Sequence, residues 1–145
     1  MRDLRNSYKA NSTALEKSTV VVISQYKEDH GSLDGILGQR GWPIRHCTNF
    51  AQARSALGEH RNSIIVTERR LPDGNWKEVL EFAGTACAVI VACQYADEQL
   101  WAEVLNVGGY DLLLKPFNTS EVSRVIAAAA RVSGSGPTPD SVQFN

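Results

Sequence analysis

The sequence lacks the long apolar segments that a membrane protein or a secreted protein needs. Its longest apolar run extends from Ala86 to Cys93, whereas a membrane-spanning helix requires roughly 20 apolar residues. The first residues also lack the apolar core of a signal peptide. We therefore expect a cytoplasmic protein with no membrane partner.

Cysteine is scarce, and its spacing suggests neither disulfides nor sulfur-bound metal. The chain has three cysteines, at Cys47, Cys87 and Cys93. An odd number at irregular spacing is typical of a reducing compartment. There is no CxxC pair and no Cys/His cluster with zinc spacing. The three histidines, His30, His46 and His60, are scattered along the sequence and indicate no catalytic or metal site.

The sequence also lacks a charge excess and a phosphate-binding glycine loop. Fifteen basic and sixteen acidic side chains give a net charge of −1, which does not favour nucleic-acid binding. No Walker-type or GxGxxG loop is present. The segment from Ser24 to Gly31, after the first expected strand, is a poor phosphate loop, so a flavodoxin-like cofactor binder is disfavoured. We expect no cofactor.

Apolar runs and helical periodicity alternate along the chain. The expected strands are Thr19 to Ile23, Trp42 to Cys47, Ile64 to Thr67, Ala88 to Cys93 and Asp111 to Leu114. The expected helices are Asp29 to Arg40, Phe50 to Glu59, Trp76 to Ala83, Asp97 to Val107 and Thr119 to Val132. Asn49, Asn75 and Asn118 each precede a helix as expected caps.

This alternation predicts an α/β fold with a single doubly wound parallel sheet of five strands and five helices. A chain of 145 residues is long enough for one domain with a proper core. We expect that domain to span residues 19–132. Residues 1–18 are polar and are expected to form a flexible arm, and residues 133–145 are expected to form a disordered tail.

One acidic residue stands where the third strand ends. Glu68 closes the run Ser63-Ile64-Ile65-Val66-Thr67-Glu68, and Leu71-Pro72-Asp73-Gly74 then forms a turn. Ligands of open parallel sheets collect at the carboxyl ends of the strands. The other residues expected at that edge are Ser24, Gln25, Cys93 and Lys115. Glu68 is therefore our main candidate site residue.

The chain resembles a response-regulator receiver domain over roughly Ser18 to Val132. Glu68 and Pro72 keep the family's spacing from the phosphoacceptor to the following proline, and Leu112 to Phe117 matches the motif of the fifth strand. The segment from Gly108 to Asp111 resembles the family's link into that strand. The resemblance implies the strand order 2-1-3-4-5. It also implies a cis bond between Lys115 and Pro116.

The family's phosphorylation chemistry is not retained at most of these positions. By resemblance, Glu68 replaces the nucleophilic aspartate, Ser24 and Gln25 replace the two acids that hold Mg²⁺, and Cys93 replaces a hydroxyl residue. Leu112 occupies the position of the aromatic residue that couples to that hydroxyl. Only the lysine remains, as Lys115. We therefore expect a degenerate pocket without a metal.

Glu28 and Asp29 are an alternative acid pair, which would require the first strand to extend through Tyr26. The undisturbed spacing from Ser24 to Gly41 fits the family better, so both acids are interpreted as first-turn residues of a helix. The pocket is then expected to hold one carboxylate and one ammonium, Glu68 and Lys115, which neutralise each other. As a hypothesis, Glu68 is a fixed, partial imitation of the phosphorylated state.

These observations predict a stand-alone, atypical receiver that is not an enzyme and acts in two-component signalling through protein contacts, without phosphorylation. The resemblance implies that helix 97–107, strand 111–114 and helix 119–132 form the surface for a partner or a homodimer. Two alternatives stay open. The chain could be a receiver phosphorylated on Glu68 or Asp73, or a redox sensor that uses Cys93.

Overall fold

The computed structural model describes residues 18–59, 63–95 and 97–134. Within these ranges, the main sheet consists of β2 (Thr19–Ile23), β3 (Ile44–Cys47), β4 (Ser63–Glu68), β7 (Ala88–Cys93) and β8 (Asp111–Leu114). The helices are α2 (Lys27–Gly38), α3 (Phe50–Glu59), α4 (Trp76–Ala83), α5 (Glu98–Asn106) and α6 (Thr119–Gly134). The expected arm, apart from Ser18, and the expected tail beyond Gly134 lie outside the described residues.

All neighbouring strands of the five-stranded sheet are parallel, in the order β3-β2-β4-β7-β8. Counted along the chain, this order is 2-1-3-4-5, so the predicted fold class and topology are confirmed. β2 and β4 are central and pair along their length, with Thr19 opposite Ser63 and Ile23 opposite Thr67. Their carboxyl ends therefore reach the same edge of the sheet.

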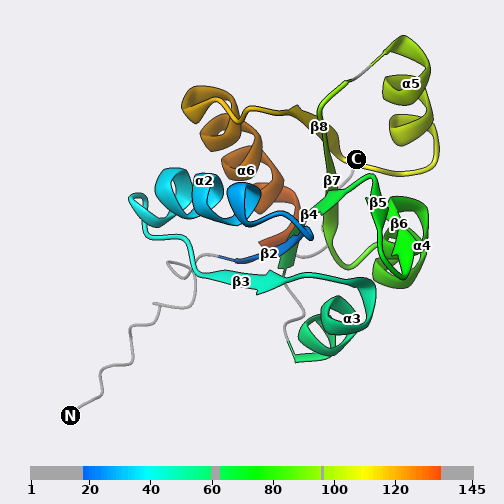
Figure 1. Ribbon diagram of the computed structural model, residues 1–145, viewed down its shortest axis with the longest axis horizontal. Helices are drawn as coiled ribbons and strands as arrows, with labels where there is room; N and C mark the ends of the chain where they lie inside the picture. The colour runs from blue at the N-terminus through cyan, green and yellow to red at the C-terminus, as the bar shows by residue number, and fades with distance from the viewer. Residues whose placement is uncertain (1–17, 60–62, 96, 135–145) are drawn as a thin grey trace.

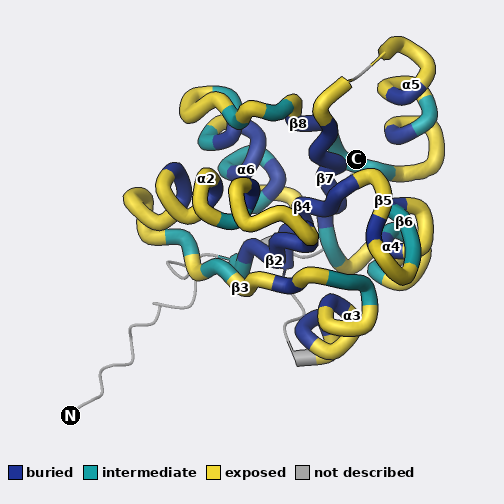
Figure 2. Tube along the Cα trace, in the orientation of Figure 1, coloured by how far each residue is buried: buried dark blue, intermediate teal, exposed yellow. Residues whose placement is uncertain are grey.

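Helices cover both faces of the sheet, with α2 and α6 on one side and α3, α4 and α5 on the other (Figure 1). Successive strand residues alternate between the two faces, so Val20 and Val22 join the α2/α6 core while Val21 and Ile23 join the α3/α4 core. The strands are buried on both faces, and the helices expose their outer surfaces (Figure 2). This explains the unbroken apolar strand sequences.

The three expected asparagine caps are present. Asn75 Oδ1 accepts hydrogen bonds from the backbone N–H groups of Lys77 and Glu78, at 2.9 and 3.1 Å. Asn49 and Asn118 each accept one such bond, from Gln52 and Glu121. These bonds satisfy N–H groups that have no partner inside the helix, and so they fix where α3, α4 and α6 begin.

Several local features differ from the sequence prediction. Strand β3 begins at Ile44 rather than at Trp42. Helix α6 ends at Gly134 rather than at Val132, so Ser133 and Gly134 belong to the helix and not to the expected disordered tail. Helix α2 begins at Lys27 and ends at Gly38, two residues earlier at each end than expected. After β4, the chain forms a small antiparallel hairpin of β5 (Arg70–Leu71) and β6 (Gly74–Asn75), where the sequence predicted only a turn. Each strand of this hairpin has two residues, which is too short for a periodicity signal.

Gly109 places the start of β8, the strand that leads to Lys115. Its backbone N–H donates to Val104 O at 2.8 Å, which ties the end of α5 to the approach of the strand. A Cβ atom at Gly109 would lie 2.8 Å from the same carbonyl oxygen. The backbone can approach α5 this closely because glycine has no side chain.

The Gly109→Ala variant should therefore be destabilised by about 1–3 kcal/mol, because the added methyl group must displace α5 or β8. Gly35→Ala is the matched control. Gly35 lies inside α2, and a Cβ there would meet nothing within 4 Å. That variant should be stabilised by about 0.5–1 kcal/mol. Urea unfolding of both variants checks the contrast, and equal effects would contradict it.

Candidate functional site

The candidate site lies at the carboxyl edge of the sheet, where β2, β4 and β8 end. β4 ends at Glu68, and Lys115 directly follows β8. The backbone N–H of Lys115 donates to Cys93 O at 2.9 Å, which holds the lysine beside the end of β7. The Lys115–Pro116 peptide bond is cis, as the resemblance implied. Residues far apart in the sequence thus meet at one edge.

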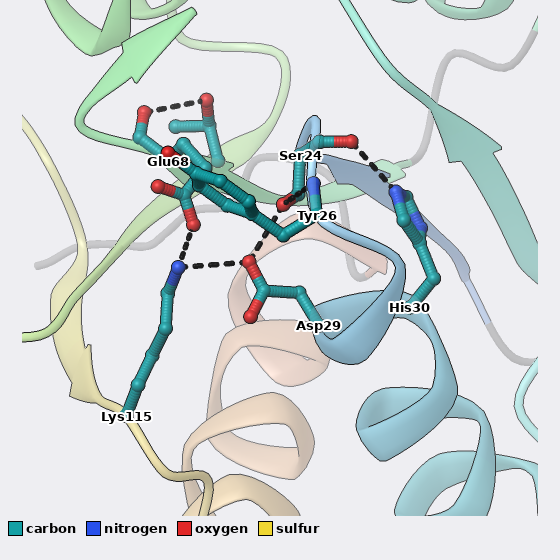
Figure 3. A network of polar contacts seen from close by, with 7 residues as sticks. Ser24, Tyr26, Asp29, His30, Glu68 and Lys115 are labelled. Atoms are coloured by element: carbon teal, nitrogen blue, oxygen red, sulfur yellow. Dashed lines mark hydrogen bonds and ion pairs between the residues drawn. The ribbon is translucent and has the colours of Figure 1, made fainter.

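The Lys115 ammonium contacts two carboxylates rather than one (Figure 3). Its Nζ atom donates to Asp29 Oδ2 at 2.8 Å and to Glu68 Oε2. All three side chains are largely buried, with exposed fractions of 16% for Lys115, 9% for Asp29 and 11% for Glu68. At this burial each charge requires a partner, since an unpaired buried charge costs on the order of 3–5 kcal/mol.

The expectation that the pocket holds a single carboxylate is therefore wrong. Asp29 does lie in the first turn of α2, as predicted, but its side chain is buried in the pocket. Because α2 begins at Lys27, Asp29 is the third residue of the helix. Side chains on a helix tilt toward its N-terminus, which here faces the ends of the strands. An acid can thus reach the pocket from the helix without any extension of the first strand.

Ser24 and Gln25, which the resemblance places at the metal-binding acids, have different environments. The Ser24 hydroxyl is buried, donates to Asp29 Oδ2 at 2.6 Å and accepts from the backbone N–H of Tyr26 at 3.0 Å. Gln25 is exposed. Ser24 thus orients the Asp29 carboxylate, while Gln25 takes no part in the hydrogen bonds described for this pocket.

Tyr26 is a pocket residue that the sequence did not reveal. The Lys115 Nζ atom lies 5.1 Å from the centroid of its ring, within the range of a cation–π contact. Tyr26 precedes α2 in an extended conformation, and 47% of its surface is exposed. A half-exposed aromatic ring therefore lies next to the buried ammonium. An isolated tyrosine after a strand carries no sequence signal for this role.

The two carboxyl groups share the lysine unequally. Burial, followed by the hydrogen bond with Asp29, raises the pKa of Glu68 to about 7. Burial also acts to raise the pKa of Asp29, but hydrogen bonds with Glu68, Lys115 and Ser24 outweigh it and lower that pKa. Near neutral pH, Asp29 is therefore the charged partner of Lys115, and Glu68 carries a proton part of the time.

Cys93 and Leu112 lie in an apolar cluster beside the pocket. Both are buried, and they pack with Trp76, Val91, Leu100 and Val104. Burial raises the pKa of the Cys93 thiol, which disfavours the reactive thiolate. Neither side chain offers a hydroxyl group or an aromatic ring, the groups that the resemblance implies for these two positions.

Asp73, the other candidate acceptor, caps a helix. Its Oδ1 accepts from the backbone N–H of Phe50 at 2.7 Å, and its Oδ2 accepts from that of Ala51 at 3.0 Å. The Phe50 hydrogen bond, with smaller help from Ala51, lowers the pKa of Asp73. Both carboxylate oxygens thus hold the start of α3. An acceptor role would break these bonds.

The pocket does not fit the Mg²⁺ ion that the resemblance implies. Mg²⁺ takes an octahedral shell of oxygen ligands that includes carboxylates. Here both pocket carboxylates already bond to Lys115, and Ser24 and Gln25 supply no further carboxylate for the ion. Across residues 18–59, 63–95 and 97–134, no cluster of three or more His, Cys, Asp or Glu residues could hold a metal ion.

No model of a known protein family matches the chain. The sequence is 24% identical to the response regulator protein PilR of Pseudomonas aeruginosa over 123 residues, which cover 81% of this chain and 27% of PilR. It is 29% identical over 102 residues to the "Probable transcriptional regulatory protein y4xI" of Sinorhizobium fredii, covering 68% of this chain and 45% of that protein. The chain thus matches less than half the length of either relative.

Among solved structures, a two-component response regulator from Clostridium difficile superposes with a TM-score of 0.70. It is 24% identical in sequence, and the match covers 79% of this chain and 97% of the other. The chain has the fold of a response-regulator receiver domain. That the pocket departs from the family's phosphorylation site at Glu68, Ser24, Gln25, Cys93 and Leu112 stays a prediction from the resemblance. No helix in the described part of the receiver is long and apolar enough to cross a membrane.

Replacement of Lys115 by methionine should destabilise the receiver by roughly 2–4 kcal/mol, because it leaves two buried carboxyl groups without their cation. Lys77→Met is the matched control. Lys77 pairs with Glu103 on the surface, where the exposed fractions are 54% and 36%. That loss should cost at most about 1 kcal/mol. In a double-mutant cycle, Asp29→Asn should restore part of the unfolding free energy that Lys115→Met removes. If the effects of the two substitutions on the unfolding free energy simply add, the proposed network is contradicted.

Stability should depend on pH through Glu68. Its pKa is about 7 in the folded chain and 4.5 ordinarily, so the folded state holds a proton that the unfolded state releases in this window. Stability should therefore fall as pH rises from 4.5 to 7, by roughly 1–3 kcal/mol in total. Glu68→Gln should remove this slope. Urea unfolding across the window measures it, and Glu81→Gln, at an exposed glutamate of α4, should retain the wild-type slope.

Proposed function

We propose that this chain is a signalling module of the two-component type that works without Mg²⁺-dependent phosphorylation. It acts in the cytoplasm by binding other proteins and is not an enzyme. The fold and the sequence similarity to response regulators support the class of protein. The proposal that the module works without Mg²⁺-dependent phosphorylation rests on one observation: the Lys115 ammonium bonds to both Asp29 and Glu68.

The ion pairs in the pocket compete directly with phosphorylation. A phosphoryl group on Glu68 would carry a charge of about −1.5 to −2 into a site where Asp29 already provides a carboxylate. Without a divalent cation, one lysine would have to balance both charges. Ser24 and Gln25 supply no carboxylate to recruit such a cation. The pocket therefore favours the unmodified state.

Glu68 is an incomplete imitation of a phosphorylated residue. Its carboxylate does reach Lys115 from the acceptor position. However, burial and the Asp29 hydrogen bond raise its pKa to about 7, so its charge is not permanent at neutral pH. We infer that the pocket holds the receiver in one conformation, with Asp29 as the main counter-charge of Lys115.

The surface formed by α5, β8 and α6 is the proposed contact with a protein partner or with a second copy. Large apolar side chains are exposed on or next to α5 and β8, namely Trp101, Leu105, Val107 and Leu114, each with 41–50% of its surface accessible. Such residues supply binding energy when a partner covers them. A surface of this kind fits a module whose output is a protein contact.

The two rival functions have less support in the structure. A phosphorylatable receiver would use Glu68, which bonds to Lys115, or Asp73, which caps α3. A redox sensor would require a reactive thiol, but Cys93 is 6% exposed and burial raises the pKa of its thiol. Both alternatives would have to break contacts or expose buried groups before any chemistry could begin.

Incubation with acetyl phosphate and Mg²⁺, followed by intact-mass measurement, tests the proposal. The wild-type chain should gain no phosphoryl group, because the pocket lacks the acids that hold the metal. A receiver with the standard aspartate and acid pair, treated in parallel, must gain one. A phosphoryl group on the wild-type chain would overturn the proposal. Its loss in Glu68→Gln or in Asp73→Asn would then identify the acceptor.

A further inference from the structure

Two histidines that are distant in the sequence meet beside the pocket. His30 lies in the first half of α2 and His46 lies on the edge strand β3. Their Nδ1 atoms face each other at 2.5 Å, and the ring centroids are 4.5 Å apart with an interplanar angle of 74°. The sequence analysis, which assigned no role to the scattered histidines, could not anticipate this contact because it depends on the pairing of β3 with β2.

The outer nitrogen of each ring already has a partner that can only accept. His30 Nε2 lies 2.8 Å from the backbone oxygen of Ser24, and His46 Nε2 lies 2.8 Å from Asp34 Oδ1. A carbonyl oxygen and an ionised carboxylate cannot donate, so each Nε2 must carry the hydrogen. In a neutral imidazole the other nitrogen then has none. With both rings neutral, the two Nδ1 lone pairs point at each other, and with one ring protonated, its Nδ1–H donates to the other Nδ1.

Two facing lone pairs repel unless a cation lies between them. A histidine that binds a metal ion typically donates its other ring N–H to a carboxylate or a backbone carbonyl, which fixes the tautomer and raises the basicity of the ligand. Ser24 O and Asp34 provide these two kinds of outer partner. Imidazole nitrogens suit Zn²⁺, Cu²⁺ and Ni²⁺ better than Mg²⁺ or Ca²⁺.

We propose that His30 and His46 form a binding site for a divalent transition-metal ion, with Nδ1 of each ring as the ligand atom. Zn–N bonds of about 2.0–2.1 Å place two ligand nitrogens roughly 3 Å apart, so the rings must separate slightly. This movement is available because His46 is at the surface, with 35% of its side chain exposed. Solvent then completes the coordination shell.

This site is joined to the charged pocket through one residue. The Ser24 carbonyl accepts from His30, while the Ser24 hydroxyl donates to Asp29, which in turn pairs with Lys115 (Figure 3). A metal ion on the histidine pair would hold His30 against Ser24. The proposed metal site at His30 and His46 is thus connected by hydrogen bonds, through Ser24, to the charged pocket.

Titration of the full-length, untagged chain with Zn²⁺ by calorimetry tests the site. We expect one ion per chain. His30→Gln and His46→Gln should each weaken binding at least tenfold. Asp34→Asn, which alters only the outer partner, should weaken it about 10-fold or more, in line with outer-partner effects. His60→Gln changes the third histidine and should bind Zn²⁺ as the wild type does.

Imidazole ¹⁵N NMR of the same samples identifies the ligand atoms. On addition of Zn²⁺, the Nδ1 resonances of both histidines should shift while both Nε2 atoms keep their hydrogens. Three results would overturn the proposal: no saturable binding, equal affinity in the His30/His46 double variant, or a Nδ1 pair that responds to pH but not to Zn²⁺, which would indicate a shared proton only. Circular dichroism of each variant establishes that it is folded.

Discussion

The pocket depends on one ammonium group held between two carboxylates. Lys115 comes from the end of β8, Glu68 from the end of β4 and Asp29 from the first turn of α2, so a single charge cluster joins three elements that are distant in the sequence. The cluster is largely buried, which makes the loss of any one member costly. Ser24 fixes the orientation of Asp29, and the Tyr26 ring contacts the lysine ammonium.

The charges show how the pocket holds two buried carboxyl groups beside one lysine. Asp29 reaches the lysine from the first turn of α2, and Glu68 reaches it from the end of β4. Because burial raises the pKa of Glu68 to about 7, this carboxyl group is partly protonated near neutral pH, which lowers the negative charge that Lys115 has to balance. The charge of the pocket is therefore sensitive to pH.

The sequence predicted the fold well because its signals are local and mutually consistent. Unbroken apolar runs indicated strands buried on both faces, and Asn49, Asn75 and Asn118 marked where helices begin. The sequence could not predict the role of Asp29, because that role depends on a two-residue shift in the start of α2 and on the direction of one side chain. Contacts of Tyr26 with Lys115, and of His30 with His46, arise from tertiary packing and leave no pattern in the chain.

The hairpin after β4 has a mechanical consequence. Its turn carries Asp73, whose two carboxylate oxygens grip the first N–H groups of α3, while the strand that enters it ends at Glu68 in the pocket. The segment that connects the pocket to α3 is therefore short, and hydrogen bonds hold it at both ends. The pocket residue Glu68 and the start of α3 are thus held by one short stretch of chain, so a displacement at the carboxyl end of β4 would also move the group that caps α3.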